Sequence, residues 1–182
     1  MSKVIIFPTD TVYGIGCPIF DTDGIKRIYE IKHRSLDKPL ACLCASLEQI
    51  EQIAVVNEKI KSLIQKFMPG ALTLILQSKK EVEEKIGYKT IGVRIPNSNF
   101  AVNLLEKYGP MLTTSVNESG EIPLNSYEEI RSVYGNVVEE IFPPSGMSSN
   151  QASTVVDVTH STLKLLREGS ITIDDLNKVW KD

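Results

Sequence analysis

The sequence predicts an α/β (α+β) fold in which helices flank a twisted mixed sheet. Short β-branched and aromatic runs alternate with segments of helical periodicity along the 182 residues, and this interleaving is typical of a sheet covered by helices. Hydrophobic residues make up 42% of the chain and charged residues 24%, close to the average of globular proteins. Because we find no internal repeat or long linker, we expect a single domain over residues 1–182.

The first expected element is a buried strand at residues 4–7, which stops at Pro8 and opens into a loop over residues 8–16. Behind the capping candidate Asp21, apolar residues recur at helical spacing as far as residue 31. Further helices are expected at residues 47–54, 58–67, 99–107, 127–134 and 174–180, and further strands at residues 40–45, 72–77, 91–94, 111–114, 137–142, 154–158 and 163–167. Residues 143–150 lack an apolar pattern, which favours a mobile loop that could serve as a lid.

The charge balance and the cysteine pattern exclude several classes of function. A net charge of -3, from 20 basic and 23 acidic residues, argues against a protein that coats nucleic acid by bulk attraction. No apolar run approaches the roughly 18 residues of a membrane span, so we expect a cytoplasmic protein without membrane contact. The residues Cys17, Cys42 and Cys44 are expected to be buried free thiols, and no ligand spacing predicts a metal site.

Polar clusters follow several of the expected strands, where an open sheet usually binds its ligands. In the first loop, Thr9 and Thr11 are two residues apart, so their hydroxyl groups point the same way in an extended segment. The glycines Gly14 and Gly16 remove side chains and would let a ligand approach the backbone. A plain turn with self-bonding threonines is the alternative interpretation.

The second cluster is basic and contains Lys32, Arg34 and Lys38. The side chains of Lys32 and Arg34 converge only if the helix ends near residues 35–39, because residues two apart on a helix face different ways. We expect both side chains to be exposed. Converging cations suit a polyphosphate, whereas a solvated helix end is the alternative.

Neutral donors and two arginines complete the candidate set. Residues 113–120 are a run of hydroxyls and an amide beyond a strand, a pattern that binds phosphate or carboxylate without adding charge. Arg94 and Arg167 each end an apolar strand, where a buried guanidinium needs an anionic partner. The strand at residues 153–157 carries Ser153 at its start. Turn chemistry and structural salt bridges are the alternatives for these residues.

Six stretches, taken in order, resemble the YrdC family. They are PTDTVYGIG at residues 8–16, KHR with KPL at residues 32–40, PG at 69–70, RIP at 94–96, TSVNESG at 114–120 and STVVD at 153–157. The resemblance implies a YrdC-like twisted mixed sheet with a concave, positively charged face. It also implies synthesis of threonylcarbamoyl-AMP and pyrophosphate from L-threonine, bicarbonate and ATP, for the N6-threonylcarbamoyladenosine modification of tRNA.

The resemblance also implies the roles of individual residues. Around ATP it places Lys32, Arg34, Lys38, Thr90, Asn117, Asn125 and Arg167. Around threonine it places Thr11, Arg94, Ser115 and Ser153. We expect Lys32 and Arg34 to be the catalytic residues that stabilise the departing pyrophosphate, and Mg²⁺ to be carried on the phosphates. The implied partners are tRNA or double-stranded RNA and the downstream tRNA threonylcarbamoyl-transferase proteins, with the protein acting as a monomer or homodimer.

Departures from the family pattern predict local differences. The first strand starts almost at the N-terminus, where family members carry a helix, so we expect an uncovered edge or pairing with a second copy. Ser35, Val116 and Leu43 replace a proline, an alanine and a histidine of the family. The chain resembles the short form of the family, which has no second domain. The rival hypotheses are an RNA-binding module, a non-synthase paralogue of the same fold and a carbamoyl-transfer relative.

Overall fold

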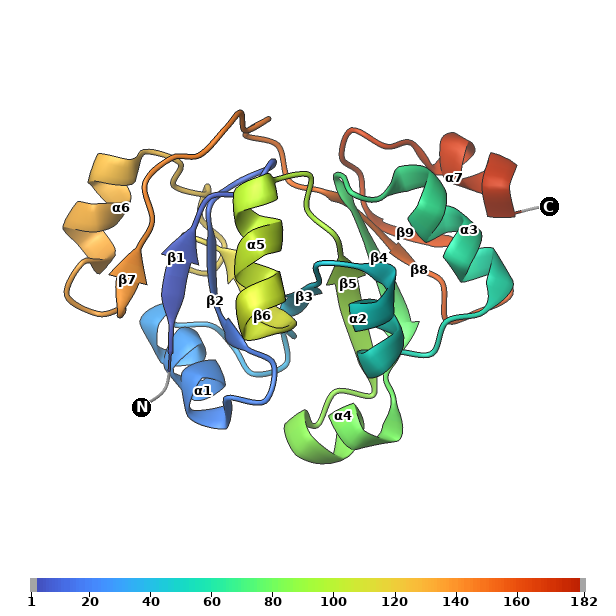
Figure 1. The fold of residues 1–182 in the computed structure, drawn as a ribbon, viewed down its shortest axis with the longest axis horizontal. Coiled ribbons are helices and arrows are strands. Elements are labelled where there is room, and N and C mark those ends of the chain that lie inside the picture. The colour runs from blue at the N-terminus through green and yellow to red at the C-terminus, as the bar shows by residue number, and fades with distance from the viewer. Residues whose placement is uncertain (1–2, 181–182) are drawn as a thin grey trace.

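The computed structural model describes residues 3–180, which form helices around one nine-stranded sheet. The strand order is β7-β1-β2-β6-β3-β5-β4-β8-β9 (Figure 1). The strands are β1 (Ile5–Phe7), β2 (Gly14–Pro18), β3 (Ala41–Leu43), β4 (Leu72–Gln77), β5 (Thr90–Arg94), β6 (Met111–Ser115), β7 (Glu140–Ile141), β8 (Thr154–Asp157) and β9 (Lys164–Arg167). The helices are α1 (Thr22–Ile31), α2 (Leu47–Ile53), α3 (Glu58–Phe67), α4 (Lys80–Ile86), α5 (Asn99–Tyr108), α6 (Tyr127–Tyr134) and α7 (Ile173–Trp180).

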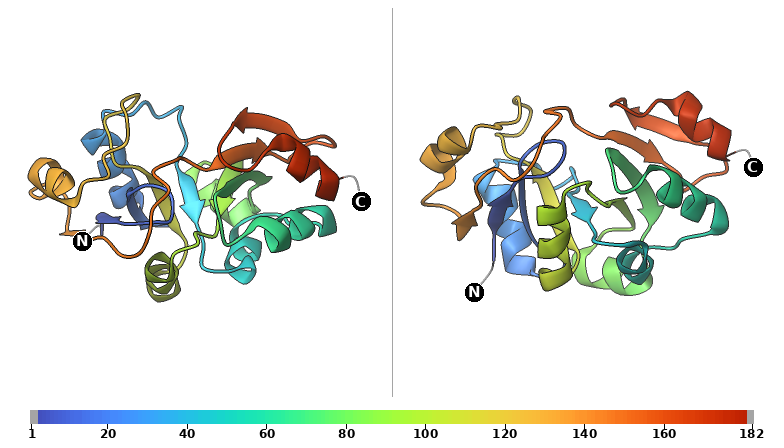
Figure 2. Two further views of the ribbon diagram at one scale, coloured as in Figure 1. Left: turned by 90° about the horizontal axis from the view of Figure 1, so that it is seen from above. Right: turned by 45° about the horizontal axis from the view of Figure 1, so that its top comes forward.

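The sheet is mixed, and this confirms the fold class expected from the sequence. The pairs β1–β7, β3–β5 and β4–β8 are parallel, while the remaining neighbours run antiparallel. Figure 1 shows α1, α5 and α6 beside the β7-β1-β2-β6 half and α2, α3, α4 and α7 beside the β5-β4-β8-β9 half. The views of Figure 2 agree with this division and place the two chain ends on opposite sides.

Four local features differ from the expectations. Residues 14–18 form β2, although residues 14–16 were expected to belong to a loop, and α4 was not expected. The expected strand at residues 137–142 is reduced to the two residues of β7. Because β7 pairs with β1, the first strand is not an uncovered edge.

Side-chain caps fix the beginnings of the helices. Asp21 accepts a hydrogen bond from the backbone N–H of Gly24 at the start of α1. Ser46, Asn57 and Ser98 cap α2, α3 and α5 in the same way. Because each cap satisfies an amide that the helix leaves unpaired, it stabilises the helix by about 1 kcal/mol.

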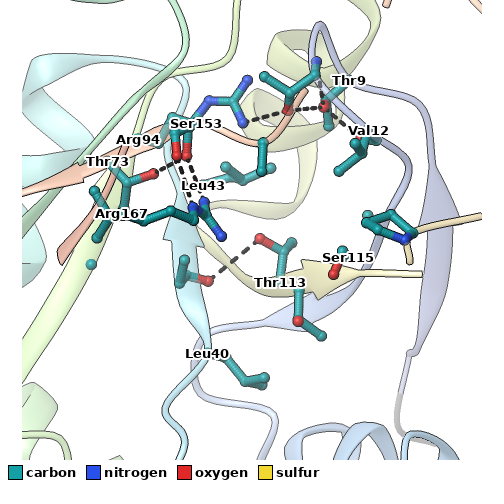
Figure 3. A pocket seen from close by; sticks show the side chains of 18 of the residues that line it. Thr9, Val12, Leu40, Leu43, Thr73, Arg94, Thr113, Ser115, Ser153 and Arg167 are labelled. Carbon is teal, nitrogen blue, oxygen red and sulfur yellow. Dashed lines mark hydrogen bonds between the residues drawn. The ribbon is translucent and has the colours of Figure 1, made fainter. Parts of the chain in front are cut away.

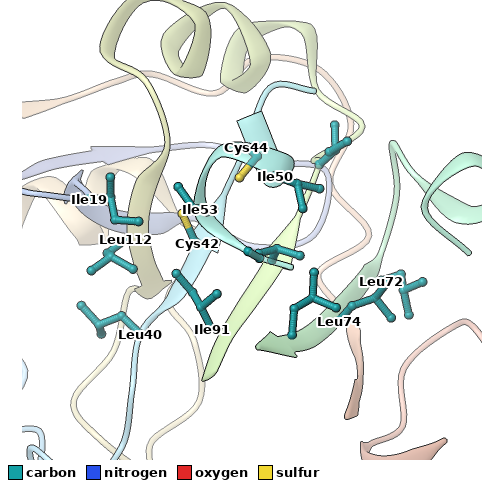
Figure 4. Packing of buried hydrophobic residues seen from close by; sticks show 14 of the residues in the cluster. Ile19, Leu40, Cys42, Cys44, Ile50, Ile53, Leu72, Leu74, Ile91 and Leu112 are labelled. Carbon is teal, nitrogen blue, oxygen red and sulfur yellow. The ribbon is translucent and has the colours of Figure 1, made fainter. Parts of the chain in front are cut away.

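Most of the buried apolar side chains form one cluster between the sheet and α1, α2, α3, α4 and α7. Figure 4 shows members of this cluster, among them Cys42 of β3, Ile50 and Ile53 of α2, and Leu72 and Leu74 of β4. A second cluster joins α5 to the row of side chains on the other face of the sheet, including Phe7. The three cysteines are buried and free, as expected. Within residues 3–180, every helix is too short or too polar to cross a lipid bilayer.

Candidate active site

A cavity of about 510 Å³ lies on the sheet face opposite α2 and α3. Figure 3 shows side chains from β3, β4, β5, β6 and β9 around it. Seven of the residues expected at the site line this cavity. They are Thr11, Arg34, Arg94, Ser115, Asn117, Ser153 and Arg167. Three arginines and one carboxylate, that of Glu121, are the charged side chains among the described lining residues, so the cavity suits an anionic ligand.

The floor of the cavity is flat because small side chains follow one another across the sheet. Thr113 of β6 pairs with Ala41 of β3, and Ala41 pairs with Gly92 of β5. A Cβ atom at position 92 would lie only 3.1 Å from the Cδ1 atom of Ile75. A larger residue at position 92 would therefore crowd Ile75, so the packing favours glycine at this point of the cavity floor.

At one end of the floor, Arg94 is held by three partners. Its Nε atom donates to the carbonyl oxygen of Gly70 at 2.9 Å, and one terminal nitrogen donates to the hydroxyl of Thr11 at 2.7 Å. The other terminal nitrogen forms an ion pair with Asp10. Burial lowers the pKa of Arg94, and the charge of Asp10 opposes this shift. Because a guanidinium has five N–H donors, two remain for a ligand.

Beside Arg94, a second arginine lies next to two hydroxyl groups. Arg167 of β9 donates to the carbonyl and hydroxyl oxygens of Ser153, at 2.9 and 3.2 Å. The hydroxyl of Ser153 is in turn 2.8 Å from that of Thr73. Arginine and paired hydroxyls of this kind bind carboxylate or phosphate oxygens, so this end of the cavity is prepared for an anion.

Lys32 differs most from its expected environment. It follows the last residue of α1 and is only 1% exposed, so the expectation of an exposed side chain was wrong. Its ammonium donates to the carbonyl oxygens of Ser115 and Asn117, both at 2.5 Å, and to the side-chain oxygen of Asn117 at 2.8 Å. Burial, with a smaller effect of Arg34, lowers the pKa of Lys32 to about 8. Lys32 therefore lies beneath the cavity wall, whereas Arg34 lines it.

The remaining expected residues surround the cavity without lining it. Lys38 and Thr90 are exposed, and Thr90 begins β5 on the face that carries Gly92. Asn125 accepts a hydrogen bond of 3.1 Å from the backbone N–H of Tyr13 and so holds the first loop. Arg34 donates to the carbonyl oxygen of Lys38 at 2.9 Å, which folds residues 34–38 back on themselves.

The segment 143–150 is exposed along its whole length, yet it is attached to the site. The backbone N–H of Ser149 donates to the carbonyl oxygen of Asp10 at 2.9 Å, and the Ser148 hydroxyl donates to that of Thr11. The segment then leads into Ser153. These two hydrogen bonds thus attach the expected loop to Asp10 and Thr11, the residues that hold Arg94.

Sequence reasoning assigned no role to Asp10, Thr73 or Glu121. Asp10 stands between the two threonines of the first cluster, and this position was the available signal. Thr73 interrupts the apolar strand β4, which indicates a polar partner on the cavity side. Glu121 lies in a polar loop, and nothing in its neighbourhood distinguishes it from a surface residue.

The fold and the cavity define an α/β protein with an arginine-lined cavity on one face of its sheet. The chain belongs to the Sua5/YciO/YrdC family, whose family model, described as "Telomere recombination", matches residues 1–169. This confirms the resemblance seen in the sequence motifs.

Curated relatives include two classes of protein. The threonylcarbamoyl-AMP synthase of Pyrococcus abyssi is 36% identical over 97% of this chain and 53% of its own length. A putative threonylcarbamoyl-AMP synthase of Mycobacterium tuberculosis is 34% identical over 97% of this chain and 83% of its own length. The uncharacterized protein YciO of Escherichia coli is 33% identical over 91% of this chain and 82% of its own length. The chain thus spans about half the length of the Pyrococcus relative.

Solved structures agree with the sequence matches. The complex of P. abyssi Sua5 with L-threonine has a TM-score of 0.90 and 35% identity, over 97% of this chain and 53% of that one. The structure of E. coli YciO has a TM-score of 0.86 and 31% identity, over 96% of this chain and 87% of that one. A full-length HypF structure, at 17% identity and a TM-score of 0.76, shares the fold.

Proposed function

We propose that this protein is a threonylcarbamoyl-AMP synthase, which converts L-threonine, bicarbonate and ATP into threonylcarbamoyl-AMP, pyrophosphate and water. The observation that carries the proposal is the convergence of Arg34, Arg94 and Arg167 with many hydroxyl groups in one cavity. Guanidinium groups suit both a carboxylate and a polyphosphate, the two anions that this reaction brings together. The names of the relatives support the same reaction, whose product serves tRNA modification in the cytoplasm through downstream transferase proteins.

The proposed ligand positions divide the residues at the cavity into two adjoining groups. The amino acid would lie among Thr11, Arg94, Ser115 and Ser153. The nucleotide would be held by Arg34, Lys38, Thr90, Asn117, Asn125 and Arg167, with Lys32 beneath its phosphates. In this arrangement the free N–H donors of Arg94 bind the threonine carboxylate, while the amino group faces the nucleotide.

The chemistry consists mainly of positioning and charge stabilisation. Threonine and bicarbonate first give a carbamate and water, and a carbamate oxygen then attacks the α-phosphorus while the bond to pyrophosphate breaks. Holding two mutually repelling anions in line lowers the entropic part of the barrier. The guanidinium of Arg34 then stabilises the charge of the departing pyrophosphate. No covalent nucleophile on the protein is required.

Mg²⁺ fits this site as a companion of the nucleotide. Among the described residues lining the cavity, Glu121 is the one carboxylate, and Mg²⁺ usually combines one or two carboxylates with substrate phosphates. We therefore propose that Mg²⁺ is carried on the phosphates, where it neutralises their charge.

The second candidate is a paralogue without synthase activity, because this chain matches YciO of E. coli nearly as well as it matches the synthases. Both candidates share the cavity and the nucleotide site. They differ in whether bicarbonate and an amino acid react with the nucleotide, so a product assay separates them.

The deciding experiment incubates the protein with ATP, Mg²⁺, labelled bicarbonate and each amino acid in turn, followed by detection of an acyl adenylate. We expect labelled threonylcarbamoyl-AMP with threonine and none without bicarbonate. Arg34→Ala should abolish pyrophosphate release, while Lys80→Ala on the exposed face of α4 should leave it unchanged. Nucleotide binding without any adenylate product would favour the paralogue.

A further inference from the structure

The ammonium of Lys32 has no donor left for a ligand. A lysine ammonium carries three N–H donors, and three protein oxygens accept from it at 2.5, 2.5 and 2.8 Å. Within the part of the chain that the structure describes, no salt bridge includes Lys32. The cation is therefore paired with amide oxygens only, although burial of a charge is costly without good partners.

These acceptors belong to one loop, residues 115–121, which begins at the last residue of β6. The hydroxyl of Ser115 donates to the side-chain oxygen of Asn117 at 2.8 Å, and the Asn117 amide donates to the carbonyl oxygen of Glu121 at 2.5 Å. The backbone N–H of Ser119 donates to the carbonyl oxygen of Lys32 at 3.2 Å. Both the backbone and the side chain of Lys32 thus attach the end of α1 to this loop.

The loop in turn forms part of the cavity wall. Ser115, Asn117 and Glu121 all line the cavity, whereas Lys32 does not. A direct contact between Lys32 and a phosphate would require at least one of the three hydrogen bonds to break and the ammonium to leave a site where it is 1% exposed. Breaking a buried charge-assisted hydrogen bond of this kind is unfavourable, because the freed oxygen atom loses its donor.

We propose that Lys32 is a positioning residue, which holds the 115–121 loop so that Ser115 faces the amino acid and Asn117 faces the nucleotide, and that its ammonium does not touch the ligand. The inference rests on the proposed function for the identity of the ligand. The role itself depends only on the contacts of Lys32. It changes the interpretation of the K-x-R pattern at residues 32–34, because the two cations then act on different partners: Arg34 on the ligand and Lys32 on the protein.

The first test measures amide hydrogen exchange in residues 115–121 of the protein without substrates. Lys32→Met keeps an unbranched apolar side chain but removes the ammonium and its donors, and we expect markedly faster exchange in this loop. Arg34→Met is the matched control, with exchange in the loop unchanged. Equal protection of the loop in the wild type and in a folded Lys32→Met variant would overturn the proposal. If Lys32→Met does not fold, Asn117→Ala, which removes one acceptor, must give faster exchange at residues 115 and 119.

The second test is a double-mutant cycle on ATP affinity. If Lys32 acts through Asn117, the double variant Lys32→Met/Asn117→Ala should bind ATP no more weakly than the weaker single variant, within about twofold. Arg167 shares no hydrogen-bond partner with the side chain of Asn117, so the losses of Arg167→Met and Asn117→Ala should multiply. Multiplying losses for Lys32→Met and Asn117→Ala would indicate direct phosphate contact.

The two proposals fail in different ways. Absence of threonylcarbamoyl-AMP from the wild-type reaction would refute the proposed function, but the exchange experiment would still decide the role of Lys32. Conversely, an active enzyme whose 115–121 loop does not respond to Lys32→Met retains its function and loses only the positioning role.

Discussion

At the residue scale, Lys32 shows how strongly a folded environment changes a side chain. The sequence places it in a basic segment typical of a solvated helix end. Its burial follows instead from the loop that β6 brings over the end of α1. Because Lys32 is buried in the folded protein and exposed in the unfolded chain, folding changes its pKa, and this change can be measured.

We expect Lys32 to make unfolding free energy depend on pH in the alkaline range. Its pKa is about 8 in the folded protein and near the ordinary 10.5 when unfolded. Between these values the unfolded chain binds more protons, so the contribution of Lys32 to stability rises with pH. We expect the unfolding free energy of the wild type, minus that of Lys32→Met, to rise between pH 7 and 10.5. Urea unfolding of both proteins across this range measures it. A constant difference would mean that the pKa of Lys32 is not lowered.

The ion pair between Asp10 and Arg94 holds the Arg94 guanidinium in place at the cavity. Asp10→Ala leaves a buried guanidinium without its counter-ion, so we expect a loss of stability of about 3–5 kcal/mol. With the guanidinium displaced, the KM for threonine should rise about tenfold, equivalent to roughly 1.4 kcal/mol. The KM for ATP should change little. Steady-state kinetics of Asp10→Ala and the milder Asp10→Asn, with each substrate varied in turn, measure both KM values. A rise in the KM for threonine alone is then distinguished from a uniform loss of activity.

At the element scale, periodicity and caps predicted most helices and strands but missed β2 and α4. Residues Gly14 and Gly16 have low strand propensity, and only pairing with β1 and β6 makes their segment a strand. Helix α4 has one buried residue, Val82, and it is supported by Lys–Glu pairs four residues apart. Its signal was Gly87, which ends the helix at a φ of 76°. Pairing between distant strands and local ion pairs leave no periodic pattern of apolar residues, so the sequence pattern revealed neither β2 nor α4.

The contact between β2 and β6 predicts different tolerances for its two glycines. A Cβ atom at Gly16 would lie 2.9 Å from the carbonyl oxygen of Leu112 and 2.5 Å from a methyl group of Thr113. We expect Gly16→Ala to lower the unfolding free energy by about 1–3 kcal/mol. A Cβ atom at Gly14 would lie 3.9 Å from its nearest neighbour. We therefore expect Gly14→Ala to change the unfolding free energy by less than about 1 kcal/mol. Urea denaturation of both variants measures this, and equal losses would argue against the β2–β6 register.

At the scale of the whole molecule, the strand order creates the site. The order β6-β3-β5-β4-β8 brings side chains from distant parts of the chain side by side on one face. The sequence indicated which residues carry suitable groups, and seven of them meet in the cavity. It did not indicate which of them would be buried, as with Lys32, or which acid would pair with Arg94. Those properties depend on which strands become neighbours, and no local pattern encodes that choice.

The charge distribution of the whole molecule separates the synthase from an RNA-binding module. The chain has a net charge of -3, while three arginines and one glutamate face the cavity. A cavity of about 510 Å³ has the size of a small-molecule site, and a negative net charge does not favour binding of a long polyanion. We therefore expect duplex RNA to bind more weakly than about 10 µM at physiological salt. Fluorescence anisotropy with labelled duplex RNA, with and without saturating ATP, measures this. Submicromolar binding that persists with ATP present would place an RNA surface outside the cavity and favour the binding module.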